Sequence, residues 1–392
     1  MKDGPDQTLS VHGGRREPHA HRSVTTPIFT SSTYSFPSTA ALRAHLDGSS
    51  PSFHYGRYGN PTVEDVERHL AELEGAGGAL FMSSGMAALS LVFLSLLRSG
   101  QHVVFTADVY RPTAELLQSL LSRFGVESDV VGSHDLAAVE AAIRPRVTRM
   151  IFTELPSNPH TRVVDLEALA AIKASHRGVR LVVDATFATP LNVRPLSLGA
   201  DVVVHSLTKY LAGHNDVIAG AVLGSAGLID ALREQRALLG SGGDPFSAYS
   251  VVRGLKTFAL RMDRHNRNAQ AVAEYLVGHS AVERVWYPGV SEHPDHEVAR
   301  RLLRGYGGVV SFVVRGGLEA GARVVDRVGL IQHSASLGGV ESLIQQPAVF
   351  TWHDLDSAGR AALGIEDGLL RLSVGLEQVE DIIADLDQAL ST

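Results

Sequence analysis

Lys209 is the residue whose type and position best fit covalent chemistry. It follows Ser206-Leu207-Thr208, directly after the apolar run at 202–205. An amine whose pKa is lowered by burial or by neighbouring positive charge can form an imine, and the hydroxyls of Ser206 and Thr208 can donate to phosphate oxygens. The other lysines lie in the N-terminal arm or in stretches with a helical pattern, where a solvated charge is the ordinary interpretation: Lys2, Lys173 and Lys256.

Two further strand ends carry groups that complement such a lysine. Ser83-Ser84-Gly85-Met86 joins a strand to a helix start, where free N–H groups and the positive helix end favour a phosphate, although a plain tight turn has the same pattern. Asp184 closes the apolar run 181–183, so its carboxylate needs a cation. A protonated ring nitrogen of a cofactor meets that need; an arginine or a helix-capping role is the alternative.

These strand ends make one site if they belong to one sheet. Ligands of an open parallel sheet collect at the carboxyl ends of its strands. A phosphate cradle, a carboxylate for a ring nitrogen and an imine lysine are the parts that a pyridoxal phosphate (PLP) pocket requires from a protein. The sequence therefore predicts a PLP site.

The elements that must position these residues alternate between strands and amphipathic helices from residue 60 to residue 255, as in repeated βαβ units. The strands are mostly unbroken apolar runs, typical of a parallel sheet covered on both faces. We expect them at 79–82, 102–106, 128–131, 150–154, 181–184, 202–206 and 217–223. We expect helices at 63–74, 112–124, 136–143, 166–176 and 228–239.

A long helical pattern at 254–278 leads into a second region. Strands are expected there at 282–287, 308–315 and 369–374, and helices at 296–303, 318–328 and 379–390. The predicted organisation is α/β. It consists of an N-terminal arm (1–59), a cofactor-binding domain with a mainly parallel sheet (60–255) and a smaller α+β C-terminal domain (256–392).

Composition excludes several classes of protein. A net charge of −7 argues against nucleic acid or an anionic membrane as a partner. Cysteine is absent, which removes disulfides, thiolate nucleophiles and Cys-type zinc sites and fits a cytoplasmic location. The stretch 75–97 has no charge, but its glycines favour a strand followed by a helix over a membrane span, and the first residues lack the apolar core of a signal sequence.

Five stretches resemble the PLP-dependent enzymes of cysteine and methionine metabolism, which include cystathionine γ-synthase, cystathionine γ-lyase and methionine γ-lyase. They are 55–62 (YGRYGNPT), 83–87 (SSGMA), 205–214 (HSLTKYLAGH), 253–257 (RGLKT) and 371–375 (RLSVG). The resemblance runs from residue 26 to the C-terminus. It implies PLP as cofactor and the fold of aspartate aminotransferase, known as fold type I.

The resemblance also implies roles for the cofactor-binding residues. Lys209 is then the Schiff-base lysine and a catalytic residue, and Asp184 pairs with the pyridine nitrogen. Tyr110 resembles the tyrosine that stacks over the ring and handles protons. The phosphate is held around the strand-to-helix turn and the two hydroxyls before the lysine: Ser84, Gly85, Met86, Ser206 and Thr208.

Other matched positions concern the substrate and the neighbouring subunit. Asn158, Ser336 and Arg371 resemble the groups near the cofactor hydroxyl and the substrate carboxylate, a task that suits the planar fork of arginine. Tyr55 and Arg57 resemble the pair that reaches the phosphate of a neighbouring subunit. The active site is then complete only in a dimer, and a homotetramer built as a dimer of dimers is expected.

The chain departs from this family at positions near the pocket. Arg111-Pro112 follows Tyr110 where the family commonly has a small residue, and Ala185 stands where asparagine is usual. Ala335 replaces a glutamate of the cystathionine-cleaving members. A methionine, a threonine and a histidine are usual where this chain has Phe350, Thr351 and Trp352. These differences concern the substrate rather than the cofactor.

Two other motifs are weaker. The cluster 292–297 (EHPDHE) mimics a metal site but reads as a turn into a helix, and no metal is expected. The glycines at 75–78 precede a strand, not a helix, so they do not form a dinucleotide fingerprint.

The expected reaction is γ-elimination from a γ-substituted L-amino acid such as cystathionine, methionine or a homoserine derivative, through a vinylglycine-type ketimine. The alternative is γ-replacement, as in a cystathionine γ-synthase. The lyase is favoured because the regions 254–264 and 334–348 look more like γ-lyases. Two other hypotheses are a non-catalytic binding protein, which has no need to keep Lys209, Asp184, Tyr110 and Arg371 together, and an aminotransferase.

Overall fold

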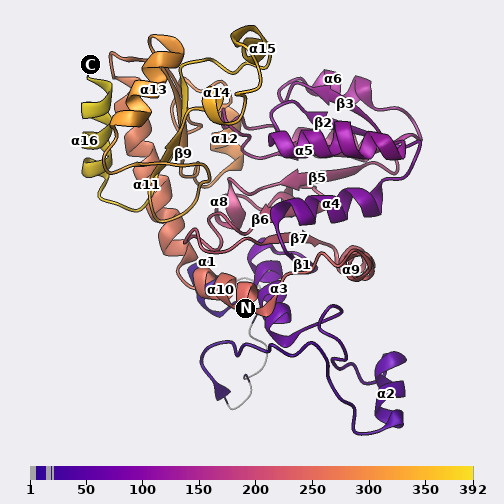
Figure 1. Ribbon diagram of the computed structural model, residues 1–392. Coiled ribbons are helices and arrows are strands. Elements are labelled where there is room, and N and C mark those ends of the chain that lie inside the picture. The colour runs from indigo at the N-terminus through magenta and orange to yellow at the C-terminus, as the bar shows by residue number, and fades with distance from the viewer. Residues whose placement is uncertain (1–5, 15–18, 20–21, 392) are drawn as a thin grey trace.

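The computed structural model describes residues 6–14, 19 and 22–391, and its strands form two sheets (Figure 1). The larger sheet has seven strands in the order β1-β7-β6-β5-β4-β2-β3. Its strands are β1 (Gly78–Met82), β2 (His102–Thr106), β3 (Glu127–Val131), β4 (Thr148–Glu154), β5 (Arg180–Asp184), β6 (Val202–Ser206) and β7 (Gly220–Gly224).

Strand β7 departs from the parallel arrangement expected for this sheet. It pairs antiparallel with both β1 and β6, whereas the pairs from β6 to β3 are parallel. Parallel strands need a crossover over the face of the sheet, usually a helix. Residues 207–219 between β6 and β7 form no such helix, so the chain turns back beside β6. The sheet is therefore mixed.

The apolar strands are covered on both faces, because alternate residues point to opposite layers. In β6, Val203 packs in one core, while Val202 and Val204 pack in the other. The first core holds α3 (Pro61–Glu74), α6 (Leu136–Ala142), α7 (Leu166–Ser175), α8 (Thr189–Asn192), η4 (Pro195–Leu198) and α10 (Pro245–Leu255). The second holds α4 (Gly85–Leu96), α5 (Arg111–Glu115), the π-helical turn η2 (Leu116–Leu120), η3 (Leu121–Phe124) and α9 (Ala226–Leu239).

The smaller sheet has the order β10-β11-β12-β9-β8. Its strands are β8 (Val282–Trp286), β9 (Val309–Val314), β10 (Gln332–His333), β11 (Leu343–Gln345) and β12 (Leu369–Ser373). The short strands β10 and β11 were not predicted, because two or three residues carry no readable alternation. The remaining helices of this part are α12 (His296–Leu302), α13 (Gly317–Arg327), α14 (Pro347–Phe350), α15 (Ser357–Ala362) and α16 (Val379–Leu390).

The helix expected at 254–278 corresponds to α11 (Phe258–Val277), except that its first two residues end the unpredicted helix α10 (Pro245–Leu255). Helix α10 ends at Leu255, and α11 (Phe258–Val277) begins after a break at Lys256–Thr257. In Figure 1, α11 runs from the large sheet to the small one, where it packs with α13 and α16. The domain limits at residues 59 and 255 stay a prediction.

The charge-free stretch 75–97 folds as β1 and α4, as expected. Among the described residues, no helix combines the length and hydropathy that crossing a membrane requires.

Candidate active site

A cavity of about 640 Å³ lies where β4, β5 and β6 end, beside the small sheet. All predicted site residues except Tyr55 and Arg57 line it: Ser84, Gly85, Met86, Tyr110, Asn158, Asp184, Ser206, Thr208, Lys209, Ser336 and Arg371. Residues from β12 and from the loop before β11 join those from the large sheet, although they lie far away in sequence.

Helices α10 and α11 contact the loop that carries Lys209 and hold it in place. The Arg261 guanidinium donates from Nη1 to the carbonyl of Tyr210 (2.6 Å) and from Nη2 to that of Leu211 (3.3 Å). Gly254 lets α10 approach closely, because a Cβ there would lie 2.3 Å from the Ala212 oxygen. The matched stretch 253–257 therefore supports the loop that carries Lys209.

Lys209 has an environment that favours its neutral form. Burial, followed by the positive charge of Arg371, lowers its pKa to about 8. Its Nζ donates to Ser336 Oγ over 2.8 Å. An amine with this pKa reaches its nucleophilic form near neutral pH, as imine formation requires.

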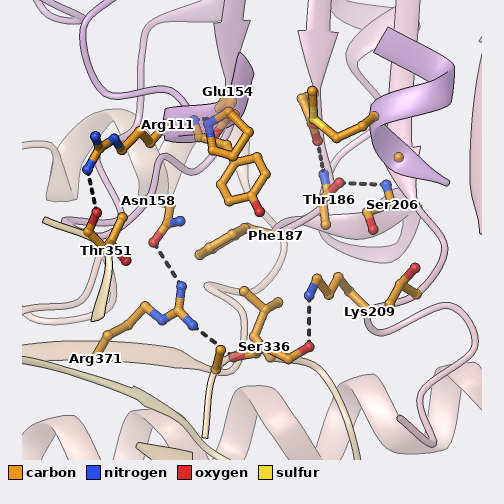
Figure 2. A pocket seen from close by; sticks show the side chains of 18 of the residues that line it. Arg111, Glu154, Asn158, Thr186, Phe187, Ser206, Lys209, Ser336, Thr351 and Arg371 are labelled. Carbon is orange, nitrogen blue, oxygen red and sulfur yellow. Dashed lines mark hydrogen bonds between the residues drawn. The ribbon is translucent and has the colours of Figure 1, made fainter. Parts of the chain in front are cut away.

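Arg371 projects from β12 and is fixed by two acceptors (Figure 2). Its Nη1 donates to Asn158 Oδ1 (3.1 Å), and its Nη2 donates to the carbonyl of Ser336 (2.9 Å). Its buried Nε has no hydrogen-bond partner among the described residues, so donor capacity remains for a carboxylate. Ser336, which joins Lys209 to Arg371, has a φ of 89°, an uncommon backbone conformation for a residue with a side chain.

Two carboxyl groups face each other across neighbouring strands. Glu154 and Asp184 are register partners at the ends of β4 and β5. Burial raises the pKa of Asp184, and hydrogen bonds from Thr186 oppose the rise. Burial, and then the charge of Asp184, raise the pKa of Glu154 well above its usual value. Among the described residues, Asp184 has no salt-bridge partner, so a cationic ring nitrogen fits beside it.

Glu154 also holds the backbone of Tyr110, whose N–H donates to Glu154 Oε1 over 2.6 Å. Sequence reasoning did not select this glutamate. It closes an apolar strand as Asp184 does, so the same signal marks it. Thr186 and Phe187, which follow Asp184 and line the cavity, were also missed.

The turn between β1 and α4 supplies donors for an anion. Gly85 and Met86 begin α4, so their N–H groups lack intrahelical acceptors. The Ser84 hydroxyl caps the helix by accepting from Ala87 N (3.0 Å). Gly220 of β7 packs against this turn so closely that a Cβ there would lie 2.1 Å from the backbone carbonyl oxygen of Ser84.

The two hydroxyls beside the lysine differ. The Thr208 hydroxyl donates to the Ala219 carbonyl (3.2 Å) and accepts from the Ala219 N–H (3.0 Å). The backbone N–H of Ser206 donates to Thr186 Oγ1 (2.8 Å), and its own hydroxyl faces Gly85. A low-pKa lysine, a buried carboxyl without a cation and a helix start with free donors together fit PLP.

The comparison with protein families decides what this pocket belongs to. The family model described as "Cys/Met metabolism PLP-dependent enzyme" matches residues 7–391. The chain belongs to this family. It is a fold type I PLP enzyme that acts on an amino acid, and the resemblance, the fold class and the cofactor inferred from the sequence are confirmed.

The relatives of the enzyme divide between two activities. Cystathionine gamma-synthase 1, chloroplastic, of Arabidopsis thaliana is 42% identical over 98% of this chain and 69% of its own length. L-methionine gamma-lyase of Porphyromonas gingivalis is 43% identical over 98% of this chain and 96% of its own. The crystal structure of metB from Corynebacterium glutamicum matches with a TM-score of 0.93 and 38% identity, covering 99% of this chain and 98% of that one.

Tyr55 and Arg57 lie away from the cavity of their own chain. They follow α2 (Thr39–Leu46), which has no buried residue and stands apart from both sheets in Figure 1. Tyr55 is 41% exposed. The Arg57 guanidinium lies 4.7 Å from the centroid of the Tyr58 ring, and its Nη1 donates to the Ala237 carbonyl (2.7 Å).

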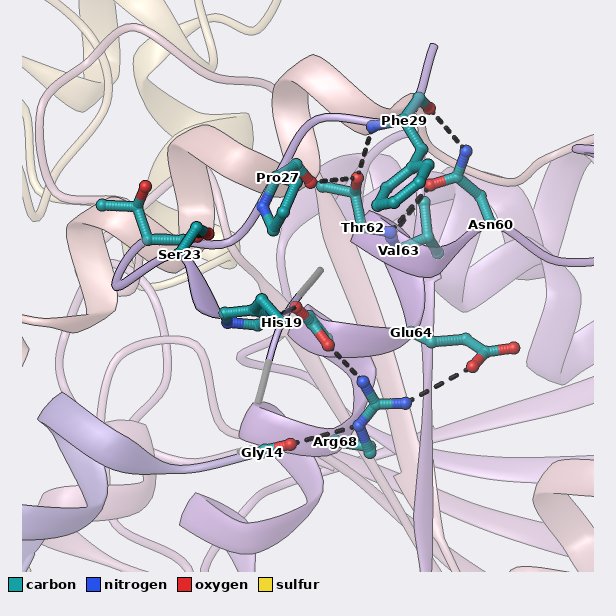
Figure 3. Close-up of polar contacts among 12 residues, drawn as sticks. Gly14, His19, Ser23, Pro27, Phe29, Asn60, Thr62, Val63, Glu64 and Arg68 are labelled. Carbon is teal, nitrogen blue, oxygen red and sulfur yellow. Dashed lines mark hydrogen bonds and ion pairs between the residues drawn. The ribbon is translucent and has the colours of Figure 1, made fainter. Parts of the chain in front are cut away.

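The segment that carries them is anchored at the start of α3 (Figure 3). Thr62 Oγ1 donates to the Pro27 carbonyl (2.8 Å) and accepts from Phe29 N (2.9 Å). Asn60 Nδ2 donates to the Phe29 carbonyl (2.7 Å). Residues 30–59 thus leave the body and return to it at one place. We call them the arm loop.

The acidic and histidine cluster at 292–297 has structural partners. Asp295 binds the Arg162 guanidinium at 2.6 and 3.0 Å, and His296 Nδ1 lies 2.8 Å from the Pro288 carbonyl. In the part of the chain that the structure describes, no three His, Asp or Glu side chains gather in a geometry that could hold a metal ion.

Proposed function

We propose that the enzyme catalyses γ-elimination from an L-amino acid with a leaving group on Cγ. The balanced reaction consumes water and yields a 2-oxo acid, ammonia and the protonated γ-substituent. The observation that carries the proposal is which positively charged side chains of the cavity remain free to bind a carboxylate. The Lys and Arg side chains of the cavity among the described residues are Arg111, Lys209 and Arg371, and Arg111 already donates four hydrogen bonds, to Glu115, Asp354 and the Thr351 carbonyl.

The substrate is held by its amino-acid end. Arg371 binds the α-carboxylate through its free Nε and its planar fork, oriented by Asn158. When bound, PLP withdraws electrons from the amino acid and so makes the Cα proton acidic. Asp184 supports this withdrawal with a negative charge at the pyridine nitrogen.

Two side chains move protons. Lys209 takes the proton from Cα, which its lowered pKa of about 8 and its contact with Ser336 support. Tyr110 lines the same cavity, and burial raises the pKa of its hydroxyl. That hydroxyl therefore stays protonated near neutral pH and can donate its proton to the departing γ-substituent.

Replacement requires a second amino acid or another nucleophile in the same cavity. A second amino acid brings a second carboxylate, which needs an unpaired cation to leave water. Arg371 is used by the first carboxylate, and Arg111 has no free donor pair. Water meets no such requirement, so elimination is favoured.

The second candidate is γ-replacement. It is supported by the relatives, because a cystathionine γ-synthase is as similar to this chain as a methionine γ-lyase. The nucleophile is then a thiol or another small group.

The deciding experiment incubates the holoenzyme with methionine, cystathionine and O-acylated homoserines, each with and without cysteine, and identifies products by mass spectrometry. We expect a 2-oxo acid and ammonia without added thiol. A thioether formed only in the presence of the thiol would establish replacement instead. Formation of a β-cleavage product alone would contradict both candidates.

The oligomeric state belongs to the same proposal. We propose a homotetramer in which Tyr55 and Arg57 of each arm loop reach the phosphate site of a neighbouring subunit. Their distance from their own cavity and the exposure of the arm loop support this arrangement. The cytoplasmic location stays a prediction.

A further inference from the structure

We call the part of the chain around the seven-stranded sheet the large lobe and the part around the five-stranded sheet the small lobe. Residues 350–354 of the small lobe are called the wall. We propose that Arg111 is a positioning residue that ties helix α5, which follows Tyr110, to the wall. Phe350 and Trp352 of the wall then set which γ-substituent fits. This assignment of the wall to the γ-substituent rests on the proposed function, whereas the tie itself does not.

Arg111 makes its contacts across the mouth of the cavity. Its Nη1 and Nη2 donate to the two carboxylate oxygens of Asp354 at 2.7 and 2.6 Å, a bidentate pair. Its Nη1 also donates to the Thr351 carbonyl (2.5 Å), and its Nε donates to Glu115 (3.0 Å). Figure 2 shows the side chain directed toward Thr351 and away from Lys209. Arg111 therefore bridges two lobes and is not available to the substrate.

Among the described residues, the hydrogen bonds between the wall and the large lobe are those of Arg111. The wall begins at the last residue of the short helix α14, and the N–H groups of Thr351 and Trp352 donate to the Pro347 carbonyl (2.9 and 3.0 Å). Trp352 packs against a small cluster of Val313, Ile365 and Leu369 in its own lobe. Phe350 is 53% exposed, yet both aromatic side chains line the cavity.

The tie connects the wall to Tyr110. That residue immediately precedes Arg111, and its backbone is fixed from the other side by Glu154. A displacement of the wall is therefore transmitted to the tyrosine one residue away. Arg111 and the aromatic pair at 350 and 352 thus belong to one structural device beside the cavity.

The chemistry of the wall selects the substrate. Its side chains at 350 and 352 are apolar and offer no positive charge to an anion, and the Arg111 guanidinium is already bound to Glu115 and Asp354. The γ-substituent that fits is uncharged and apolar, such as a thioether carrying an alkyl group. A substituent that ends in a carboxylate fits poorly.

The fluorescence of Trp352 reports whether the Arg111–Asp354 contact holds the wall in place. The chain has two tryptophans, so Trp286→Phe leaves Trp352 as the sole emitter. In this parent we compare Arg111→Ala and Asp354→Asn with Arg144→Ala. The control removes a similar ion pair, to Glu127 and Asp129, that lies within the large lobe. The readouts are acrylamide quenching of Trp352 without substrate, and KM and kcat for methionine and cystathionine.

We expect both tie variants to raise the quenching constant, and to raise the KM for the apolar substrate about two- to fivefold, the range of a partly exposed ion pair. The control should match the parent. Concentrated NaCl should reproduce the quenching change in the parent but not in Arg111→Ala, because salt screens the pair. If Arg111→Ala does not fold, Asp354→Asn takes its place as the variant that should not respond to salt.

The pH dependence separates this tie from an ordinary surface pair. The Arg111 guanidinium, donating hydrogen bonds, lowers the pKa of Asp354 to about 2. A depressed carboxyl pKa gives stability that is present at neutral pH and lost only as the pH falls through the depressed value. Quenching should therefore stay close to its value at neutral pH down to about pH 3, at which a carboxyl with the ordinary pKa of about 3.9 is already mostly protonated.

Equal quenching in Arg111→Ala, Asp354→Asn and Arg144→Ala, with no response to salt, would overturn the proposal. Faster turnover of cystathionine than of methionine by the parent would overturn the assignment of the wall. An enzyme with the expected quenching pattern but no γ-elimination keeps the tie and loses the proposed reaction, so the two failures are distinguishable.

Discussion

At the scale of single residues, the site depends on how a few charges share a poorly solvated cavity. Lys209 and Arg371 lie on either side of Ser336, and burial lowers both pKa values, that of Arg371 to about 10. Two positive groups held together in this way favour the neutral lysine, since lysine gives up its proton more easily than arginine. The same pair of residues thus binds a carboxylate and activates an amine.

This arrangement predicts how fast the apoenzyme captures PLP at different pH. Only the neutral amine attacks the aldehyde, and its fraction rises as the pH passes through the lysine pKa. The rate at which the visible absorbance band appears should therefore rise with pH, and the midpoint of this rise should lie at about pH 8. Arg371→Met removes a positive charge and should move the midpoint upward. An unchanged midpoint in that variant would contradict the role given to the arginine charge, and Lys209→Ala should show no band of this kind.

At the scale of elements, the phosphate end of the site depends on the contact between β7 and the turn that starts α4. Strand β7 runs antiparallel beside β1, and this brings Gly220 against the Ser84–Gly85 peptide. A side chain at this glycine would occupy the place of the turn. The unexpected direction of β7 is therefore tied to the geometry of the anion site.

Gly220→Ala tests this contact. Its Cβ would lie 2.1 Å from the Ser84 oxygen, so the turn must move. We expect a loss of about 1–3 kcal/mol in the free energy of unfolding, typical of overpacking, together with weaker PLP binding. Urea denaturation and cofactor titration measure both quantities. The matched control is Gly227→Ala in α9, where an added Cβ meets nothing within 4 Å; a similar loss in the control would show that the close contact is not the cause.

At the scale of the whole molecule, the arm loop extends from the body without a core of its own. Its helix α2 has no buried residue, and Leu46 is 70% exposed. Exposed apolar groups on a segment anchored at both ends favour an interface with another copy of the chain. The proposed exchange of Tyr55 and Arg57 between subunits follows from this layout.

Mixed subunits test the exchange. Lys209→Ala and Arg57→Ala each disable one part of the same site, but a dimer of the two variants contains one site with both native residues. Random reassociation should restore about a quarter of the native activity, because about half of the dimers are mixed and each has one intact site. Activity no greater than the sum of the separate variants would place Arg57 outside the neighbouring site. Light scattering checks the expected tetramer.

Much of this architecture could be predicted from the sequence. The runs that became β2, β4, β5 and β6 are apolar because both faces of these strands are covered, and the polar residues that end them mark the ligand edge. The short strands β10 and β11 could not be predicted, since two or three residues carry no readable alternation and their place is set by pairing within the small sheet. The break at Lys256–Thr257 lies inside a continuous helical pattern, so the sequence does not mark it. Glu154 had a readable signal, but its partner Tyr110 became evident only in three dimensions.

The sequence by itself determined the cofactor chemistry, because an imine lysine, a strand-end carboxylate and a helix start are local features that each follow a predicted strand, and such strand ends meet at one edge of a sheet. Only the tertiary structure decided what Arg111 does. Its partner Asp354 lies on the other lobe, and no local pattern reveals whether a guanidinium faces a substrate or spans a cavity mouth. That choice depends on how the two sheets of the chain meet, a property of the packed chain as a whole.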